Sequence, residues 1–396
     1  MSEGRGVTFA RGFTAGAAMA GVKDGASERL DVALVASSAP CSAAGVFTTN
    51  QVIAAPCVIT KQHLGRGPLR AIVANSGNAN ACTGPQGERD AIAMASAAAA
   101  MLGVSPHEVA VASTGVIGVP LPAERIAAAL PGIELSVGGW DAASRAIMTT
   151  DTRPKVAQRE VALQRGSVRV GGIAKGAGMI HPNMATLLAF VTTDALADRA
   201  ELQAILRGAA DVTFNTISVD GDMSTNDTLL LLANGASGVS VADRDRHAFA
   251  DAVTAVCDDL ARAIVADGEG VTRVFAVRVQ GAATAADATL AARVITTSSL
   301  VKTAIHGGDP NWGRILAAAG RSGARVDARL ASVRIGSIPV YARGEPCAVA
   351  DAAVRAAFAT SIVEIELDLG LGDGEAQAWG GDLSAEYVRI NADYTT

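Results

Sequence analysis

Helical and strand-like patterns alternate along the whole chain, and this alternation restricts the fold more than any other feature. Gln86–Leu102 is rich in alanine and favours a helix. Further helices are predicted at 122–130, where a proline stands in the first turn, and at 287–306, which ends in a glycine pair. Apolar residues at spacings of three and four predict one more buried helix face, made by Phe249, Val253, Val256, Leu260 and Ile264.

Short runs of β-branched and other apolar residues lie between these helices. They predict strands at 109–112, 156–163, 167–170, 186–192, 228–233, 271–279, 332–342 and 362–367. Such a mixture is typical of an α/β protein with helices layered on sheets. The sequence has no internal repeat and no low-complexity linker, so composition does not place a domain boundary.

The charge balance excludes several classes of protein. The 396 residues include 33 basic and 39 acidic side chains, and 49% are hydrophobic, so the chain is neither disordered nor supercharged. The pI near 5.5 argues against nucleic acid or an anionic membrane as the main partner. Because no uninterrupted apolar run reaches about 18 residues and the N-terminus lacks a signal-peptide pattern, we expect a cytoplasmic protein.

The cysteines and histidines do not form a recognisable ligand set. The cysteine count is odd, the residues are far apart and none forms a CxxC pair, which predicts buried reduced thiols rather than disulfides or metal ligands. The five histidines are scattered and no HExxH motif is present, so no metal is expected. The cysteines are Cys41, Cys57, Cys82, Cys257 and Cys347.

One segment, VGGIAKGAGMIHPNMATLLAFVTT (170–193), concentrates reactive side chains. Lys175, His181, Asn183 and Thr186 lie within twelve positions. A phosphate-binding loop is poorly supported, because a Walker loop needs serine or threonine after its lysine and Lys175 is followed by glycine. A dinucleotide fingerprint would need a helix next, and a strand pattern follows instead. From spacing alone two modest interpretations stay open. The glycines form a flexible surface turn (Gly171, Gly172, Gly176, Gly178), and the threonine is an ordinary strand residue.

The block KGAGMIHPNMATLLAF resembles the nucleophile segment of the ArgJ family, the glutamate N-acetyltransferases or ornithine acetyltransferases. Other blocks that resemble this family are spread over nearly the whole chain. They are NSGNANACTG (75–84), ASTGVIG (112–118), TTDTRPK (149–155), SVDGDMSTNDT (218–228), ADGEG (266–270), HGGDPNWGRI (306–315) and NADYTT (391–396).

The resemblance implies a layered α/β sandwich of the ArgJ/DmpA type that cleaves itself into two chains. The cut would fall between Ala185 and Thr186. It would give an α chain (1–185) with the oxyanion hole and a β chain (186–396) with the nucleophile and a substrate-binding C-terminus. The Thr186 hydroxyl attacks the carbonyl of Ala185, and water hydrolyses the resulting ester. The freed α-amine, with a pKa of about 7.7–8.0, can then act as general base for the hydroxyl of the same residue.

The implied reaction moves an acetyl group from N2-acetylornithine to glutamate through an acetyl-threonine intermediate, in arginine biosynthesis. The resemblance places the oxyanion hole at Thr114 and Gly115. It implies substrate contacts at Thr152, Lys175, Thr186, Glu269, Asn391 and Thr396. Lys175 could pair with a carboxylate and Glu269 with an amine. His181 and the matched His306 and Trp312 have no assigned role, and packing is the first expectation for the last two.

Three alternatives can be separated by experiment. A related N-terminal-threonine amidohydrolase or aminopeptidase would pass the acyl group to water. A non-enzymatic amino-acid-binding protein would stay a single band near 40 kDa. Within the family, the donor is either acetylornithine alone or also acetyl-CoA, which would add amino-acid acetyltransferase activity. The resemblance implies a heterotetramer of two α and two β chains, and neither a cofactor nor a macromolecular partner such as nucleic acid or membrane is expected.

Overall fold

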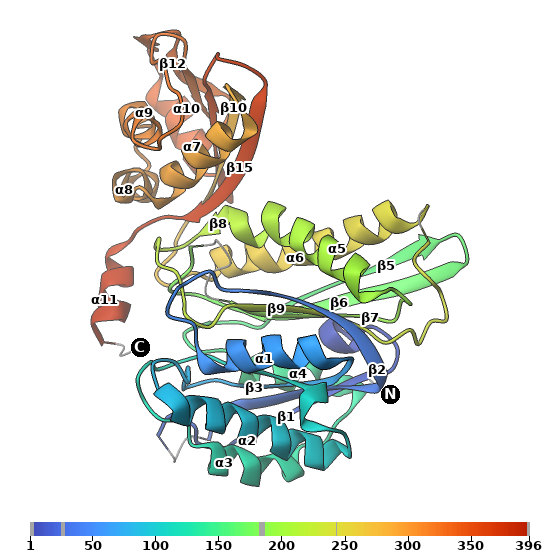
Figure 1. The fold of residues 1–396 in the computed structure, drawn as a ribbon. Coiled ribbons are helices and arrows are strands. Elements are labelled where there is room, and N and C mark those ends of the chain that lie inside the picture. The colour runs from blue at the N-terminus through green and yellow to red at the C-terminus, as the bar shows by residue number, and fades with distance from the viewer. Residues whose placement is uncertain (1–3, 25–27, 182–186, 243, 394–396) are drawn as a thin grey trace. The chain divides into compact units, whose positions relative to one another are not determined.

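The computed structural model describes residues 4–24, 28–181, 187–242 and 244–393, and it divides the chain into two compact units. Unit 1 comprises residues up to 215 together with 222–264, and unit 2 comprises 216–221 together with residues from 265 onward (Figure 1). Both units combine helices with a sheet, so the predicted α/β class is confirmed.

Unit 1 is built on an eight-stranded sheet with the order β4-β3-β2-β9-β7-β6-β5, and β1 pairs with β2 at the side of this path. The parallel pairs are β3 with β4 and β7 with β9, and the other neighbours are antiparallel. The strands are β1 (Phe13–Ala18), β2 (Val32–Phe47), β3 (Leu69–Asn75), β4 (Val109–Ser113), β5 (Lys155–Leu163), β6 (Gly166–Lys175), β7 (Leu188–Thr193) and β9 (Thr228–Ala233).

The long strand β2 joins the two halves of this sheet. Its first part pairs with β3 and its second part, Ser42–Phe47, pairs with β9, with an irregular register between Ala36 and Cys41. Alternate residues enter different cores, as strand geometry requires. Val32 and Leu34 join one cluster, whereas Ala33 and Val35 join another that also holds buried residues of β6, β7 and β9.

Helices cover the strands of unit 1 in layers. Buried alanines of α2 pack with β3 and β4, α5 packs against β2, and Leu260 of α6 lies against Gly172 of β6 (Figure 1). The apolar face predicted for α6 is confirmed, because its five residues are fully buried. The helices are α1 (Ala55–Arg66), α2 (Gly84–Leu102), α3 (Ala123–Ala129), α4 (Trp140–Ala146), α5 (Arg199–Val212) and α6 (Arg246–Ala266).

Unit 2 has its own seven-stranded sheet and core. The order is β13-β12-β11-β14-β10-β15-β8, and α7 packs against β10 and β15. The strands are β8 (Ile217–Ser218), β10 (Val274–Ala282), β11 (Ser332–Ile335), β12 (Ile338–Ala342), β13 (Glu345–Pro346), β14 (Ile362–Asp368) and β15 (Gly374–Gly381). The helices are α7 (Ala285–Thr297), α8 (Ser299–Gly307), α9 (Trp312–Gly320), α10 (Asp351–Phe358) and α11 (Ala385–Asp393).

Three sequence predictions need correction. The single helix expected at 287–306 is two helices, because Ser298 is extended and caps α8 by accepting a hydrogen bond from Val301 N–H. The single strand expected at 332–342 is a hairpin that turns at Gly336, whose φ is +56°. Gly171 and Gly172 are not part of a turn. They are paired residues of β6, and a Cβ on Gly171 would lie 2.0 Å from Gly6 O.

The cysteine prediction holds in part. All five thiols are free, and Cys41, Cys57 and Cys257 are buried, but Cys82 is exposed and Cys347 is half-buried. Over the described ranges, no helix is long and apolar enough to cross a membrane. The same ranges contain no cluster of three or more histidine, cysteine or acidic side chains placed to bind a metal ion.

Candidate active site

Three strand ends meet where the reactive segment of unit 1 lies. Lys175 ends β6 and is paired with Leu188, the first residue of β7, and Leu188 is paired with Thr228, the first residue of β9. The predicted cleavage residues Ala185 and Thr186 lie outside the described residues. Leu187, which follows them in the chain, is buried beside these strand ends.

Lys175 is buried inside a group of charged side chains. It is only 3% exposed, and its Nζ donates a hydrogen bond to Thr114 Oγ1 at 3.2 Å. Asp151 Oδ1 accepts hydrogen bonds from Lys155 Nζ at 2.6 Å and from Gly176 N–H at 2.7 Å. Lys155 is itself 1% exposed. Two lysines and one aspartate are therefore held in a water-poor environment, where charge interactions are stronger than at a surface.

The lysines keep Asp151 ionised despite its burial. Burial alone would raise the pKa of this carboxyl, but the positive charges of Lys175 and Lys155, with the Gly176 amide, outweigh it and hold the pKa at about 2. Asp151 is therefore a fixed negative charge near Lys175. It is a counter-charge for Lys175, and it offsets part of the desolvation penalty of burying the ammonium group.

Thr114 and Gly115 follow β4 and have the donors that the oxyanion prediction requires. Because Lys175 donates to Thr114 Oγ1, the proton of that hydroxyl is directed toward a different acceptor. Thr114 N–H donates a hydrogen bond to Asn75 O at 3.0 Å, whereas Gly115 N–H donates to no group among the described residues. Gly115 has φ +133°, and an added Cβ would lie 2.3 Å from Gly77 C, so only glycine fits here.

Asp227 is the other buried acid at these strand ends. Its side chain has no exposed surface, and Oδ1 accepts a hydrogen bond from Leu187 N–H at 2.9 Å. Burial raises the pKa of the carboxyl well above its usual value, against the opposing effects of the Leu187 amide and Lys175. Asp151 and Asp227 thus have pKa values shifted in opposite directions, a pattern typical of functional sites.

The other predicted substrate residues fall into two places. Thr152 is exposed and adjoins Asp151 in unit 1. In unit 2, Glu269 is 8% exposed in the turn after α6, and its Oε2 accepts a hydrogen bond from Asn391 Nδ2 of α11 at 2.9 Å. The structure therefore brings Lys175 together with Thr114, and Glu269 together with Asn391. Thr396 lies outside the described residues.

The residues without an assigned role are placed as follows. His181 is half-buried, next to the undescribed segment. In unit 2, His306 Nδ1 and Asp382 Oδ2 are 2.8 Å apart. Trp312 stacks on Tyr341 with ring centroids 4.6 Å apart, in agreement with the packing role expected for it. His306 is a member of a polar network and is not simply packed.

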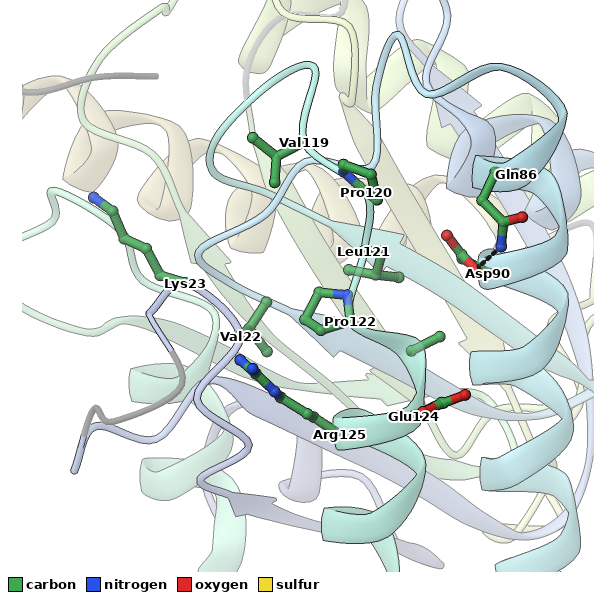
Figure 2. A pocket seen from close by; sticks show the side chains of 11 residues that line it. Val22, Lys23, Gln86, Asp90, Val119, Pro120, Leu121, Pro122, Glu124 and Arg125 are labelled. Carbon is green, nitrogen blue, oxygen red and sulfur yellow. Dashed lines mark hydrogen bonds between the residues drawn. The ribbon is translucent and has the colours of Figure 1, made fainter.

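A cavity of about 530 Å³ lies elsewhere in unit 1, and none of the predicted site residues lines it (Figure 2). Its wall includes Val119 and Pro120, whose carbonyls accept hydrogen bonds from Asn78 Nδ2. Gln86 Nε2 donates to Asp90 Oδ1 at 2.6 Å on the opposite side. The cavity is therefore a neighbour of the segment after Gly115, but it is not part of the Lys175 group.

Sequence reasoning missed Asp151, Lys155 and Asp227. All three stand in blocks that resemble the family: Asp151 and Lys155 in TTDTRPK, and Asp227 in SVDGDMSTNDT. A usable signal was available, since Lys155 and Asp227 lie at the starts of two apolar strand patterns. A charged residue beside a buried strand needs a partner. In the structure, β5 is paired directly with β6, which ends in Lys175, and only β7 lies between β6 and β9.

Comparison with known proteins gives a consistent result over the full length. The sequence model of the ArgJ family matches residues 14–396. An "arginine biosynthesis bifunctional protein ArgJ" from Symbiobacterium thermophilum is 51% identical over 99% of this chain and 98% of its own length. A protein of the same name from Thermus thermophilus is 50% identical over 98% of this chain and 100% of its own. A crystal structure of that protein from Bacillus halodurans has a TM-score of 0.50 at 42% identity, and it matches 52% of this chain and 98% of the solved chain.

Proposed function

The chain belongs to the ArgJ family, and from this premise we propose that it transfers the acetyl group of N2-acetylornithine to glutamate, through an acetyl ester of Thr186. The observation that carries the proposal is that Lys175, at the end of β6, donates a hydrogen bond to Thr114, next to Gly115, and is paired with the first residue of β7. The family match favours this transferase over the related amidohydrolase.

Self-cleavage between Ala185 and Thr186 is part of the proposal. Its products would be chains of 185 and 211 residues, and the solved Bacillus halodurans chain, which corresponds to 52% of this one, has a length that fits one such product. The sheet explains how two chains would stay together. Strands β7 and β9 would come from the second chain, and they pair with β6 and β2 of the first.

Acetyl transfer needs a nucleophile and an oxyanion hole. The Thr186 hydroxyl attacks the amide carbonyl of acetylornithine while the α-amine takes its proton, and collapse of the tetrahedral intermediate releases ornithine with that proton on its amine. The negative oxygen of the intermediate accepts hydrogen bonds from Thr114 O–H and Gly115 N–H. In the second half of the reaction the amine of glutamate attacks the ester. The same two donors stabilise the negative oxygen of this second intermediate.

Charge supports this assignment of the oxyanion hole. Lys175 Nζ donates a hydrogen bond to Thr114 Oγ1 at 3.2 Å. The positive charge withdraws electron density from that oxygen and makes the Thr114 hydroxyl a stronger hydrogen-bond donor. The same ammonium can attract the carboxylate of a substrate, as the family resemblance implies. Glu269, held by Asn391, would receive a substrate amine, and Thr152 and Thr396 complete the proposed contacts.

Two tests decide the proposal. Denaturing electrophoresis of the purified protein should give two bands near 20 kDa in place of one near 40 kDa. Thr186→Ala should give one band and no transfer, with thermal stability close to that of the normal chain. Normal cleavage or normal turnover by Thr186→Ala would overturn the assignment. Excess hydrolysis over transfer to glutamate in the normal protein would instead favour the amidohydrolase.

The relatives are named bifunctional proteins, which supports a second acetyl donor, acetyl-CoA. The thioester of acetyl-CoA could acetylate the same threonine. Acetylation of glutamate with acetyl-CoA as sole donor tests this directly. No resident cofactor is needed for either reaction. The heterotetramer and the cytoplasmic location stay predictions, which sedimentation of the cleaved protein and cell fractionation can check.

A further inference from the structure

A buried carboxyl that the acetyl-transfer mechanism does not use stands at the start of β9. Asp227 has no exposed surface, and its Oδ2 has no hydrogen-bond partner among the described residues. The nearby Thr48 hydroxyl has its one proton directed to Ser224 O at 2.7 Å. A buried carboxyl oxygen without a partner is costly, so its retention calls for an explanation.

Among the described residues, the side chain of Asp227 has one hydrogen bond, and it is to the backbone next to the proposed nucleophile. Its Oδ1 accepts a hydrogen bond from Leu187 N–H at 2.9 Å, and that nitrogen is bonded covalently to the carbonyl carbon of Thr186. On the other side of the same residue, Leu187 O accepts a hydrogen bond from Thr228 N–H at 3.0 Å. Leu187 is thus held through both of its backbone polar groups by two consecutive residues, Asp227 and Thr228.

Cleavage would make this clamp necessary. Strand β7 begins at Leu188, so a cut before Thr186 leaves a new chain end of two residues ahead of the strand. Chain ends fray unless they are tied down, and a nucleophile must be held to within a fraction of an ångström. The ladder supplies one bond to Leu187, through Thr228, and the side chain of Asp227 supplies the bond on the side facing Thr186.

We infer that Asp227 is a positioning residue for the proposed nucleophile: by holding Leu187 N–H it fixes the new chain end in register at the start of β7. The inference rests on the proposed function. It is distinct from a role as counter-charge, because Asp151 already fills that role for Lys175 and Lys155. An uncharged acceptor in place of the carboxyl should therefore suffice.

The experiment compares two substitutions that have the same number of side-chain heavy atoms as aspartate. Asp227→Asn keeps an oxygen for Leu187 N–H, whereas Asp227→Leu removes it. We expect self-cleavage and kcat per cleaved chain close to normal in the asparagine variant. In the leucine variant we expect kcat per cleaved chain to fall by about 10²-fold, as misplacement of a reacting group does, with KM for N2-acetylornithine little changed. Cleaved chains are counted by mass spectrometry.

A matched control separates positioning from simple destabilisation. Asp194 is also fully buried and lies just past the other end of β7, where it accepts hydrogen bonds from Arg169 N–H at 2.8 Å and Arg11 N–H at 3.3 Å. Asp194→Leu should lower the melting temperature and leave kcat per cleaved chain unchanged.

Three results would overturn the inference. They are normal kcat in Asp227→Leu, equal losses in the asparagine and leucine variants, and an equal loss of kcat in Asp194→Leu. Each presupposes that the normal protein is cleaved and transfers acetyl groups. A normal protein that does neither would refute the proposed function itself, so the two failures are distinguishable.

Discussion

Unit 1 and unit 2 both bury aspartates, but they satisfy them differently. In unit 2, Asp382 accepts hydrogen bonds from Thr272 N–H, Thr272 Oγ1 and Arg273 N–H and contacts His306, at distances between 2.6 and 3.0 Å. In unit 1, the side chain of Asp227 has one hydrogen bond to the described residues, and its Oδ2 has no partner among them. A carboxyl whose oxygens are all hydrogen-bonded stabilises a loop. A buried carboxyl with an oxygen that lacks a partner lowers the stability of the fold, so its presence indicates a functional requirement for that residue.

The largest effect on stability is expected in unit 1, from the buried group of Lys175, Lys155 and Asp151. Asp151→Asn would remove the charge that compensates two buried lysines, so we expect the free energy of unfolding to fall by about 3–5 kcal/mol. Denaturant titration measures it. The control is Asp141→Asn, which breaks the exposed pair with Arg145 and should cost about 0–1 kcal/mol. Equal losses in the two variants would remove the special status of the buried group.

The low pKa of Asp151 adds a prediction about pH. The pKa is about 2 in the folded protein and about 3.9 in an unfolded chain, so the carboxyl contributes stability above pH 4. That contribution, on the order of 2 kcal/mol, is lost as the pH falls from about 4 to 2. The difference in unfolding free energy between the normal protein and Asp151→Asn should therefore shrink by about 2 kcal/mol as the pH falls from about 4 to 2, and a difference that does not change with pH would contradict the assignment.

Thr114→Val isolates the oxyanion donor with little change in shape. Loss of the hydroxyl should lower kcat by about 10²–10³-fold, because a donor to the developing charge is removed. The melting temperature should change little, since the hydroxyl has one hydrogen bond from Lys175 and lies at a strand end. Steady-state kinetics with N2-acetylornithine and glutamate provides the measurement, and an unaltered kcat would exclude Thr114 from the mechanism.

Asp382→Asn tests the other side of the comparison. We expect a loss of about 2 kcal/mol in unfolding free energy, because hydroxyl and amide donors would face an NH₂ group, and no change in kcat. Burial would raise the pKa of Asp382, but its hydrogen bonds outweigh this and lower the pKa, so its contribution is present above the unfolded pKa and is lost as the pH falls. A kcat that drops with the stability would show that this network also serves the reaction.

Glu269→Gln should have the smallest effect on protein stability, and it should selectively weaken substrate binding. The glutamine keeps an acceptor for Asn391 Nδ2 but lacks the charge for a substrate amine. We expect the KM for N2-acetylornithine to rise about tenfold, with kcat retained. Glu386→Gln, on the exposed face of α11, is the control. A lower kcat at unchanged KM would assign Glu269 to the chemistry instead of binding.

The sequence predicted local elements well where one periodicity continued without interruption. The helix at α2, the face of α6 and the strand β9 agree with the structure, because propensity and burial pattern favour the same state there. It failed where a single residue changes the direction of the chain. Ser298 divides a continuous helical pattern into α7 and α8, and Gly336 turns one strand pattern into a hairpin.

The site was predictable as a set of blocks but not as a set of contacts. Resemblance picked out Lys175 and Thr114, which are 61 positions apart and form a hydrogen bond. It did not pick out Asp151 and Asp227. A charged residue at the start of an apolar strand pattern marks Asp227 as one that needs a partner, but the partner itself lies on another strand, and the same is true of Asp151. Pairing of β6, β7 and β9 decides those contacts, and register between distant strands is not visible in a single sequence.

Mass spectrometry of protein mixed with N2-acetylornithine and quenched in acid before glutamate is added tests the central claim most directly. We predict a 211-residue chain that begins at Thr186 and carries one acetyl group on that residue, which glutamate removes on a second mixing. An uncut 396-residue chain that transfers acetyl groups at full rate, or an acetyl group located on another residue, would contradict it.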